Sequence, residues 1–591
     1  MPLPPLLRRR KTGNPAIKSH NRMNDKSASY NAGTCLTRIA EQYPDSIAVA
    51  QPVKRGQKTL RDALGNRLFE TITFAVLDRR SDDAAAGLRA AGLTPGMKIV
   101  LMVRHGIDFI ALVYAIFKAG ATLVMIDPGG GMKQVVGCLH AVDPDGFAAV
   151  PAVQTARALM GRTFPHAKLN LTVGKTCIPR RLTMARLLRR FKGSPPNPAA
   201  VSPDDPAAII FTSGSTGPAK GVLYTHRVIT TQVEEIRKRY GIKPGTVDLA
   251  AFPFFGLFNA AMGSLTVIPD MDTTHPGAAD PAAFVDVANQ WKITQSFASP
   301  AVWRRVVRYC RDTGKNIPTL RRAISAGAPF PADLLPDFLA ILHPEGDIFT
   351  PYGATESLPA ASIGAREILA ETAQLSRQGK GTCVGKPFEQ ITWRVIPISD
   401  EPIERLESVT SLPPGEIGEL ALTGPQVTHE YVTQTEANRY AKIRDGQGRI
   451  WHRIGDVGWL DAQNRFWFCG RKAHRVETPE GPLFSVPCEA ILNQHPDLAR
   501  TALAGIPSAV PGYREPVIFL EPKPEKFPRT ESEKRALIDS VRTMAAASPV
   551  TQRIGNFLIM AQFPVDVRHN AKINREKLSE IAAKTLAARQ S

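Results

Sequence analysis

The chain has 591 residues, of which 43% are hydrophobic and 22% charged, values that are ordinary for a globular protein and exclude wholesale disorder. A chain of this length is too long to fold around a single hydrophobic core, so two or more packed units are expected. A net charge of +20 attracts polyanions such as nucleic acids. Because no nucleic-acid-binding motif accompanies it, we favour a solvated basic surface and expect no nucleic-acid partner.

The seven cysteines lie far apart and form no CxxC pair, so the sequence predicts neither a disulfide framework nor a zinc site. A reducing compartment, the cytoplasm, is the expected location. The most apolar stretch, residues 107–126, contains Asp108 and Lys118. We therefore predict a buried helix followed by a buried strand there, and no transmembrane segment.

Residues 1–29 are rich in arginine, lysine and proline, and we expect either a disordered basic tail or a true start at Met23. From residue 30 the pattern becomes globular, and helical and strand-like stretches alternate. This alternation predicts a layered α/β domain with a largely parallel sheet. The predicted helices are residues 36–42, 74–91 and 109–118, and the predicted strands are residues 46–51, 98–103, 122–126 and 207–211.

A proline-rich segment, residues 193–206, is predicted to be a surface linker just before the apolar strand 207–211. Further strand–helix alternation continues to about Cys469. We place a second unit after it, so that the predicted domains are residues 30–469 and residues 470–591.

A loop rich in glycine and hydroxyl groups follows the strand 207–211. Glycines allow the backbone to turn sharply and approach a ligand closely, and hydroxyls, backbone N–H groups and a lysine can hold phosphate oxygens. The spacing fits neither the Walker A loop nor the serine-hydrolase elbow. A phosphate-binding loop is therefore predicted at Thr212-Ser213-Gly214-Ser215-Thr216-Gly217-Pro218-Ala219-Lys220-Gly221.

Together with four further motifs, this loop resembles the adenylate-forming superfamily, which includes acyl-CoA synthetases, luciferases and nonribosomal adenylation domains. The other motifs are Tyr352-Gly353-Ala354-Thr355-Glu356, Gly455-Asp456, Gly470-Arg471 and Lys572. The resemblance implies an α/β fold with a large layered N-terminal domain and a small mobile α+β C-terminal domain. In that superfamily the small domain rotates between two half-reactions.

The resemblance also implies the substrate ATP, the cofactor Mg²⁺, and a role for each motif residue. Thr355 donates to the α-phosphate, Glu356 binds Mg²⁺, and Lys572 contacts the reacting carboxylate. The expected nucleotide-binding residues are Thr212, Ser213, Gly214, Ser215, Thr216, Gly217 and Lys220 for the phosphates, Gly327, Ala328, Pro329 and Tyr352 for adenine, Asp456 for the ribose, and Arg471 for the ribose or phosphate.

The sequence departs from the superfamily pattern in three segments. The stretch 252–258, which is expected to line the acyl pocket, has Phe255 or Gly256 where relatives often carry histidine. Lys472 and Ala473 follow Arg471 at the expected hinge, where Asp or Lys is common at the second position. The passage 481–489, which helps to form the pantetheine tunnel of CoA ligases, is altered, and this puts CoA use in doubt.

With these departures the chain resembles the branch of olefin β-lactone synthetases. That resemblance implies adenylation of a 2-alkyl-3-hydroxy fatty acid, followed by attack of its own 3-hydroxyl to close a β-lactone, and it permits an assembly with other olefin-pathway enzymes. His452 and His474 are the candidates considered for the base, without preference. A long-chain acyl-CoA ligase is the alternative enzyme, and an inactive fatty-acid-binding or scaffold subunit is the non-enzymatic alternative.

Overall fold

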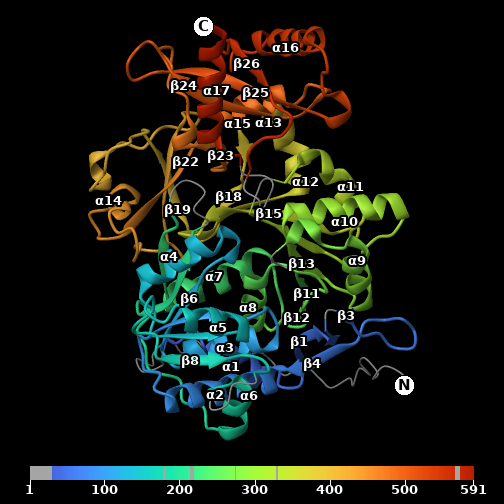
Figure 1. The fold of residues 1–591 in the computed structure, drawn as a ribbon, viewed down its shortest axis with the longest axis vertical. Coiled ribbons are helices and arrows are strands. Elements are labelled where there is room, and N and C mark those ends of the chain that lie inside the picture. Colours follow the sequence, from blue (N-terminus) through green and yellow to red (C-terminus); the bar gives the residue numbers. More distant parts are fainter. Residues whose placement is uncertain are drawn as a thin grey trace.

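The computed structural model describes residues 30–56, 58–176, 181–212, 218–272, 275–327, 330–565 and 573–590. The predicted tail, residues 1–29, lies outside them, as do Ser213–Gly217, Ala328, Pro329 and Lys572. Alternating helices and strands build the lower body of Figure 1, and the segment after residue 490 forms a separate group of elements at its top.

The first sheet has nine strands, and its centre is parallel. Strand β15 pairs in parallel with β14, β14 with β13, β13 with β11, and β11 with β12, so their carboxyl ends share one edge. In spatial order the strands are β18 (Lys386–Pro387), β16 (Ser357–Gly364), β15 (Asp347–Ala354), β14 (Arg322–Ser325), β13 (Gln295–Ala298), β11 (Val247–Ala250), β12 (Leu265–Val267), β1 (Ile47–Pro52) and β4 (Phe69–Thr73).

The second sheet has six strands, five of them parallel, and the predicted strand 207–211 is the second in spatial order. Only β10 runs antiparallel, as the return strand of β9. The strands in spatial order are β10 (Gly221–Thr225), β9 (Pro206–Phe211), β6 (Thr122–Met125), β5 (Lys98–Met102), β7 (Gly146–Ala149) and β8 (Leu169–Thr172).

Two smaller sheets follow later in the chain, the first antiparallel and the second mixed. A two-stranded ribbon, β2 (Lys54–Arg55) with β3 (Lys58–Thr59), precedes β4. The third sheet contains β17 (Thr382–Cys383), β23 (Phe466–Arg471), β22 (Ile450–Leu460), β20 (Gly418–Thr423) and β19 (Thr392–Ile396), with β21 (Lys442–Arg444) on β22. The last sheet contains β24 (Leu498–Pro507), β25 (Arg514–Pro522) and β26 (Asn556–Ile559). The domain boundary predicted at Gly470 lies inside β23.

Helix α3 (Ile107–Lys118) illustrates how the core of the lower body is built. Its residues are apolar on nearly all sides and almost all buried, as expected for a helix enclosed by other elements. Its last residue, Lys118, is only 2% exposed, and its ammonium forms ion pairs of 2.6 and 2.7 Å with Asp78 and Asp82 of helix α2 (Phe74–Ala90). The helix and strand predicted for residues 107–126 are confirmed.

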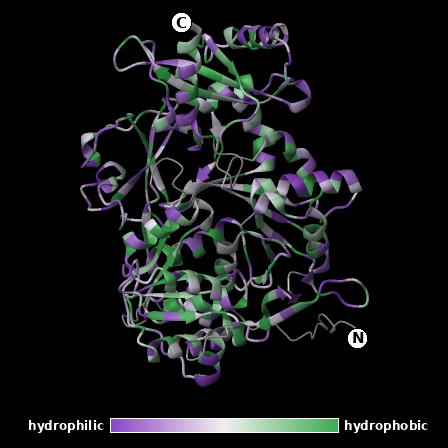
Figure 2. Ribbon diagram, in the orientation of Figure 1, coloured by the Kyte–Doolittle hydropathy of each residue, from purple (hydrophilic) through white to green (hydrophobic). Residues whose placement is uncertain are grey.

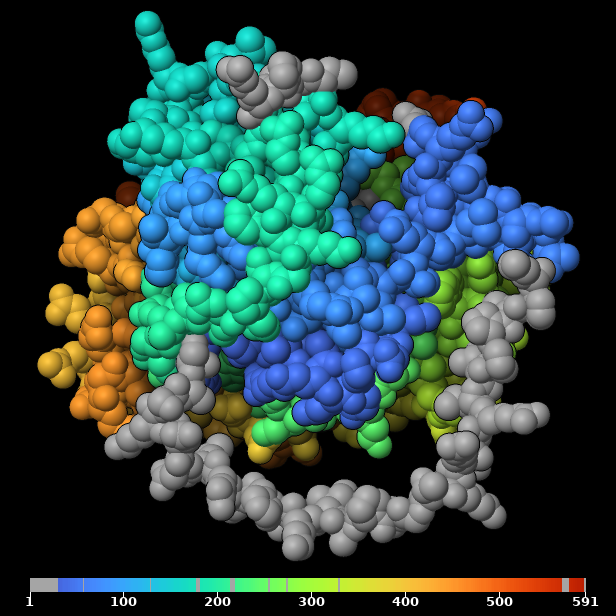
Figure 3. All heavy atoms as spheres, turned by 90° about the horizontal axis from the view of Figure 1, so that it is seen from below, coloured from blue at the N-terminus to red at the C-terminus, as the bar shows by residue number. Residues whose placement is uncertain are grey.

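The remaining helices cover the sheets. Figure 3 views the lower end, where α2 packs against both α1 and α6. Helix α16 carries mostly hydrophilic residues in Figure 2 and buries only Leu537, Val541 and Ala545. These helices are α1 (Thr34–Gln42), α4 (Met132–Val142), α5 (Pro151–Leu159), α6 (Met184–Arg190), α7 (His226–Arg239), α8 (Pro253–Met262), α9 (Pro281–Gln290), α10 (Pro300–Thr313), α11 (Leu335–Ala340), α12 (Ala365–Glu367), α13 (Ala373–Arg377), α14 (Ala437–Ala441), α15 (Ser485–Leu492), α16 (Glu531–Ala546) and α17 (Arg575–Gln590).

Two predictions from composition can be compared with the described residues. No helix among them has the length and apolar character needed to cross a membrane. Six cysteines fall in the described part, and all six are free thiols: Cys35, Cys138, Cys310, Cys383, Cys469 and Cys488.

Candidate functional site

The predicted phosphate, acyl and adenine segments follow the carboxyl ends of parallel strands in the two large sheets. The phosphate loop follows β9, Phe252 follows β11, and the segment around Gly327 follows β14. Tyr352 lies near the end of β15. In open α/β sheets, ligands bind at this edge, because loops from neighbouring strands meet there.

The two ends of the phosphate loop are tied together. The backbone N–H of Thr212 donates to the Lys220 carbonyl over 3.0 Å, and the Lys220 N–H donates to the Thr212 hydroxyl over 3.0 Å. The residues between them that sequence assigns to phosphate, Ser213–Gly217, lie outside the described residues. Lys220 Nζ lies 5.3 Å from the centroid of the Tyr431 ring, which places its charge beside the residues that surround Glu356.

Tyr352, Asp456 and Arg471 form one connected group from three strands. The Tyr352 hydroxyl donates to Asp456 Oδ2 over 2.5 Å, and Arg471 Nη1 lies 2.6 Å from Asp456 Oδ1. Asp456 and Arg471 are directly paired across β22 and β23, so the sheet register itself positions the ion pair. Burial and the Asp456 charge raise the pKa of Tyr352 well above its ordinary value, and the phenol therefore remains a donor.

Thr355 and Glu356 occupy the tight turn between β15 and β16. The Tyr224 hydroxyl donates to the Thr355 carbonyl, and the Tyr431 hydroxyl donates to Glu356 Oε1 over 2.6 Å. Thr428 binds the Glu356 carbonyl through its N–H over 2.9 Å and its hydroxyl over 3.1 Å. The Glu356 residue is only 8% exposed, and its orientation is fixed from both the main chain and the side chain.

Lys442, at the start of β21, was not singled out from the sequence, although it lies beside this turn. Its ammonium donates to the Thr428 carbonyl over 2.6 Å and lies 5.5 Å from the Tyr431 ring centroid. Burial lowers the pKa of Lys442 to about 7, and the Glu356 charge partly offsets that effect. Lys442 belongs to no recognisable motif. The same is true of three further residues around the turn that were not predicted: Tyr224, Thr428 and Tyr431.

The segment that sequence assigns to adenine begins at the end of β14. The Ser325 hydroxyl is buried and has no hydrogen-bond partner among the described residues. Gly327 has a φ of +94°, a left-handed backbone conformation that side chains rarely adopt. Ala328 and Pro329 lie outside the described residues, so only the start of the predicted segment is placed.

The aromatic segment expected to line the acyl pocket forms the start of α8. Phe252 is 43% exposed, and its ring lies 5.0 Å from that of Phe297, at the end of β13. Leu257 and Phe258 are half-buried. Gly256 faces the imidazole of His105, a residue from the loop between β5 and α3. An apolar surface is therefore present at the same sheet edge as Tyr352.

The two histidines considered as bases lie in different settings. His452 is buried on β22, with Nδ1 3.1 Å from the Ala441 carbonyl, and burial holds its pKa well below the ordinary value. Burial also lowers the pKa of His474 to about 4, with Arg575 and Arg471 adding to the effect.

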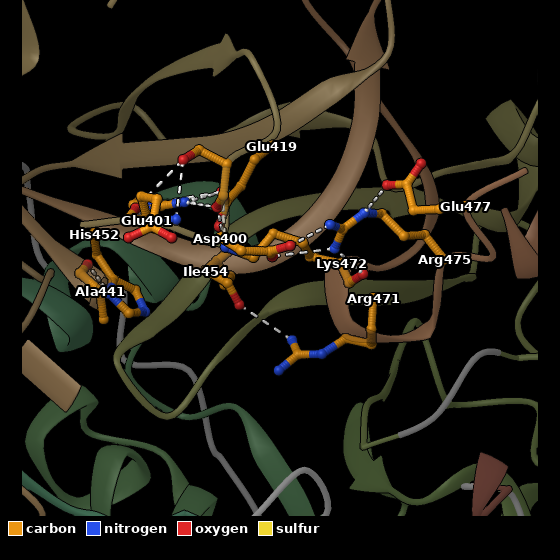
Figure 4. A network of polar contacts seen from close by, with 12 residues as sticks. Asp400, Glu401, Glu419, Ala441, His452, Ile454, Arg471, Lys472, Arg475 and Glu477 are labelled. Atoms are coloured by element: carbon orange, nitrogen blue, oxygen red, sulfur yellow. Dashed lines mark hydrogen bonds and ion pairs between the residues drawn. The ribbon is translucent and has the colours of Figure 1, made fainter. Parts of the chain in front are cut away.

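The chain around the expected hinge is held by a network of ion pairs, shown in Figure 4. Lys472 Nζ lies 3.2 Å from Glu419, which is also paired with Arg453 at 2.6 Å. Arg475 pairs with Asp400 and with Glu477. Lys472 is thus anchored to β20 of the third sheet, immediately beside Arg471.

Lys572 lies outside the described residues, in the segment 566–572. The residues that flank this segment are bridged, because Val565 pairs with Ile573 in antiparallel fashion. Arg575 follows and forms ion-paired hydrogen bonds of 2.5 and 3.0 Å with Glu489. The described residues on the two sides of this segment therefore lie next to each other.

Known proteins resemble this chain in sequence over almost its whole length. The AMP-binding enzyme family matches residues 36–432. An olefin beta-lactone synthetase of Xanthomonas campestris pv. campestris is 42% identical over 558 residues, which cover 94% of this chain and 97% of that protein. A second olefin beta-lactone synthetase, from Stenotrophomonas maltophilia, is 40% identical over 564 residues, which cover 95% of this chain and 99% of that protein.

Solved structures share the fold at lower sequence identity. ATP-bound MatB from Rhodopseudomonas palustris has a TM-score of 0.71 and 18% identity, with 94% of this chain and 99% of that chain covered. The amide bond synthetase McbA from Marinactinospora thermotolerans also has a TM-score of 0.71, with 19% identity. The match covers 93% of this chain and 99% of that chain. The α/β fold expected from the sequence is confirmed.

Proposed function

Because this chain belongs to the AMP-binding enzyme family, we propose that it activates a 2-alkyl-3-hydroxy fatty acid with ATP and converts it into a β-lactone. The reaction releases pyrophosphate in the first step and AMP in the second. The observation that carries the proposal is the near-full-length identity of about 40% to two olefin beta-lactone synthetases. The contacts that join Tyr352, Asp456 and Arg471 across two sheets support the adenylation step independently.

In the first step a carboxylate oxygen attacks the α-phosphorus of ATP, and the bond to pyrophosphate breaks. Negative charge spreads over the phosphate oxygens, so donors and cations must be arranged beforehand. We assign Lys220 and the loop after Thr212 to the phosphates and Thr355 to the α-phosphate. Asp456, held by Tyr352 and Arg471, is assigned to the ribose, and Lys572 to the reacting carboxylate.

The proposed cofactor of this step is Mg²⁺, bound by Glu356. Its carboxylate fits such a role, because Tyr431 occupies only Oε1 and Oε2 accepts no hydrogen bond from the described residues. No cluster of three potential ligands exists in the described part of the chain, and Mg²⁺ often takes one carboxylate together with phosphate oxygens. The ion supplies positive charge that neutralises the phosphates.

In the second step the 3-hydroxyl of the acyl-adenylate attacks the acyl carbon. A C–O bond forms within the substrate, the C–O bond to AMP breaks, and the hydroxyl proton leaves. The nucleophile is part of the same molecule, and its high effective concentration offsets part of the strain of the small ring. No thiol acceptor is required, in keeping with the altered passage at residues 481–489.

We also propose that the enzyme acts in the cytoplasm, where its free cysteines remain reduced, and that it assembles with other enzymes of olefin synthesis. The alternative activity is that of a long-chain acyl-CoA ligase, which requires CoA as the second nucleophile. The alternatives differ in their products as well as in their need for CoA.

The deciding experiment supplies ATP, Mg²⁺ and a racemic 2-alkyl-3-hydroxy fatty acid, with and without CoA. We expect AMP and a β-lactone in equal amounts without CoA, identified by NMR on unheated samples because β-lactones lose CO₂ on heating. Formation of AMP and a thioester only when CoA is present would instead establish an acyl-CoA ligase.

A further inference from the structure

The positive charge of the chain is concentrated in one segment. Residues 146–203 contain ten lysines and arginines and no aspartate or glutamate. This segment is about a tenth of the chain, and it carries half of the net charge of +20. A surface on which both signs are mixed has little attraction for other charged molecules, whereas cations gathered without acids attract an anionic partner.

The structure places several of these cations around helix α6. Helix α2 packs against α6 and contributes two more arginines, of which Arg80 is paired with Asp108 at 2.5 Å. The other cations around α6 form no ion pair with any described residue, and most of them are exposed. The surface formed in this way is called here the α6 face, and it consists of Arg79, Arg80, Lys175, Arg181, Arg186, Arg189, Arg190 and Lys192.

The α6 face contains a hollow of about 440 Å³. Arg186 Nη1 donates to the Arg181 carbonyl over 3.3 Å, which holds these two arginines together at its wall. Guanidinium and ammonium groups are the side chains that bind phosphate oxygens. The charged residues among those that line the hollow are four cations and a single acid: Arg80, Lys175, Arg181, Arg186 and Asp108.

This hollow is separate from the proposed ATP site. Lys175 follows β8, the outer strand of the second sheet, whereas the phosphate loop follows β9, four strand positions away. Four strand spacings correspond to about 19 Å. In Figure 1, α2 and α6 lie at the lower end of the molecule, and β15, which carries Tyr352, lies near its middle. Figure 3 views that lower end directly.

The α6 face extends beyond the hollow, because Arg79, Arg189, Arg190 and Lys192 do not line it. Such an array matches many phosphates side by side better than one small anion. Large apolar side chains are also exposed close to the cations in sequence: Val76, one turn before Arg80 on α2, is 44% exposed, and Leu159, at the end of α5, is 85% exposed. Cations together with exposed apolar side chains suit the headgroup region of a bilayer. A nucleic-acid backbone would leave these apolar side chains in water.

We propose that the α6 face binds the surface of a membrane that contains anionic phospholipid, with a headgroup phosphate in the hollow. The binding is peripheral, and its strength comes from the cations of the face. The proposed substrate has two alkyl chains and therefore partitions into membranes, so an enzyme bound at the surface meets it there. This inference goes beyond the proposed function, and its test needs neither ATP nor substrate.

The test measures co-sedimentation of the full chain with vesicles of phosphatidylcholine, alone or mixed with half as much phosphatidylglycerol. We expect binding only to the mixed vesicles and its loss in about 1 M NaCl, which screens the charges. Each basic residue at an anionic surface contributes about fivefold in affinity, so the triple variant Arg186→Ala, Arg189→Ala, Arg190→Ala should bind about 100-fold more weakly.

The matched control removes three exposed arginines of α10, two of which already have acidic partners. This triple variant, Arg304→Ala, Arg308→Ala, Arg311→Ala, should bind the mixed vesicles within about threefold of the wild type, because paired surface charges contribute little. Thermal unfolding at the wild-type Tm shows that each variant is folded.

A second variant tests the hollow. Lys175→Ala with Arg181→Ala removes two of its cations, and we expect vesicle binding to weaken about 25-fold. Equal binding to both kinds of vesicle, or a loss below threefold in the α6 variant, would overturn the proposal. Tighter binding to duplex DNA than to mixed vesicles would overturn it in favour of nucleic acid. Binding of soluble pyrophosphate that requires Lys175 and Arg181, without vesicle binding, would overturn it in favour of a soluble phosphate ester. Absence of lactone formation by the wild type would bear on the proposed function alone.

Discussion

The hydroxyl of Tyr352 donates a 2.5 Å hydrogen bond to Asp456, a residue 104 positions further along the chain. Asp456 is simultaneously paired with Arg471. The three side chains therefore form a rigid unit in which the carboxylate is oriented before nucleotide arrives. Such orientation lowers the entropic cost of binding the ribose hydroxyls.

Replacement of Asp456 by Asn should weaken nucleotide binding strongly, because it removes the negative charge assigned to the ribose and leaves the half-buried guanidinium of Arg471 without a counter-charge. We expect KM for ATP to rise about 10- to 100-fold in pyrophosphate exchange. Tyr352→Phe removes only one hydrogen bond, worth about 1 kcal/mol, and should raise KM about fivefold. An equal loss in both variants would show that the hydrogen bond from the Tyr352 hydroxyl matters as much as the negative charge of Asp456, and would contradict this ranking.

Lys442 should make stability depend on pH. Its pKa is about 7 in the folded protein against 10.5 for an ordinary lysine, so the unfolded chain binds one more proton between these values. The contribution of Lys442 to the free energy of unfolding therefore rises with pH across this window, and its full penalty applies below pH 7.

Lys442→Met removes that penalty while it nearly conserves volume. Thermal unfolding should show a Tm several degrees higher than that of the wild type at pH 6, and the gain should shrink towards pH 10. Pyrophosphate exchange should fall, because Thr428, whose N–H and hydroxyl hold Glu356, loses the donor to its own carbonyl. A Tm gain that does not change with pH would contradict the assigned pKa.

Glu419 should be important for stability, because it is paired with both Arg453 and Lys472 in a buried setting. The side chains of Glu419 and Arg453 are each only 1% exposed. Glu419→Gln leaves the buried Arg453 and the partly buried Lys472 without their shared carboxylate, and we expect a loss of about 3–5 kcal/mol in urea unfolding. The exposed pair Arg321–Glu345 provides the control: Glu345→Gln should cost less than about 1 kcal/mol.

Lys572→Ala should abolish adenylation while ATP still binds, because this lysine is assigned to the reacting carboxylate rather than to the nucleotide. Isothermal titration with ATP should give a Kd close to that of the wild type, and pyrophosphate exchange should be lost. Normal pyrophosphate release by this variant would disprove the assignment.

Much of the fold could be predicted because its signals are local. Strand-like and helix-like stretches alternate along the sequence, and this pattern predicted α2 and α3 to within two residues. The position of the phosphate loop after β9 followed from one motif. The partners Tyr431, Lys442 and His105 could not be predicted. Each is a single residue without a motif, and its neighbours are set by sheet order and helix packing rather than by spacing in sequence.

The free thiols described above acquire a meaning from the proposed product. A strained four-membered lactone acylates nucleophilic thiolates, so an enzyme that releases one risks covalent self-inactivation. Burial raises the pKa of all six described cysteines, to about 12 for Cys383, Cys469 and Cys488. The thiolate is the reactive form, and such sites hold almost none of it. The described thiols are therefore poorly reactive towards the electrophile that the enzyme makes.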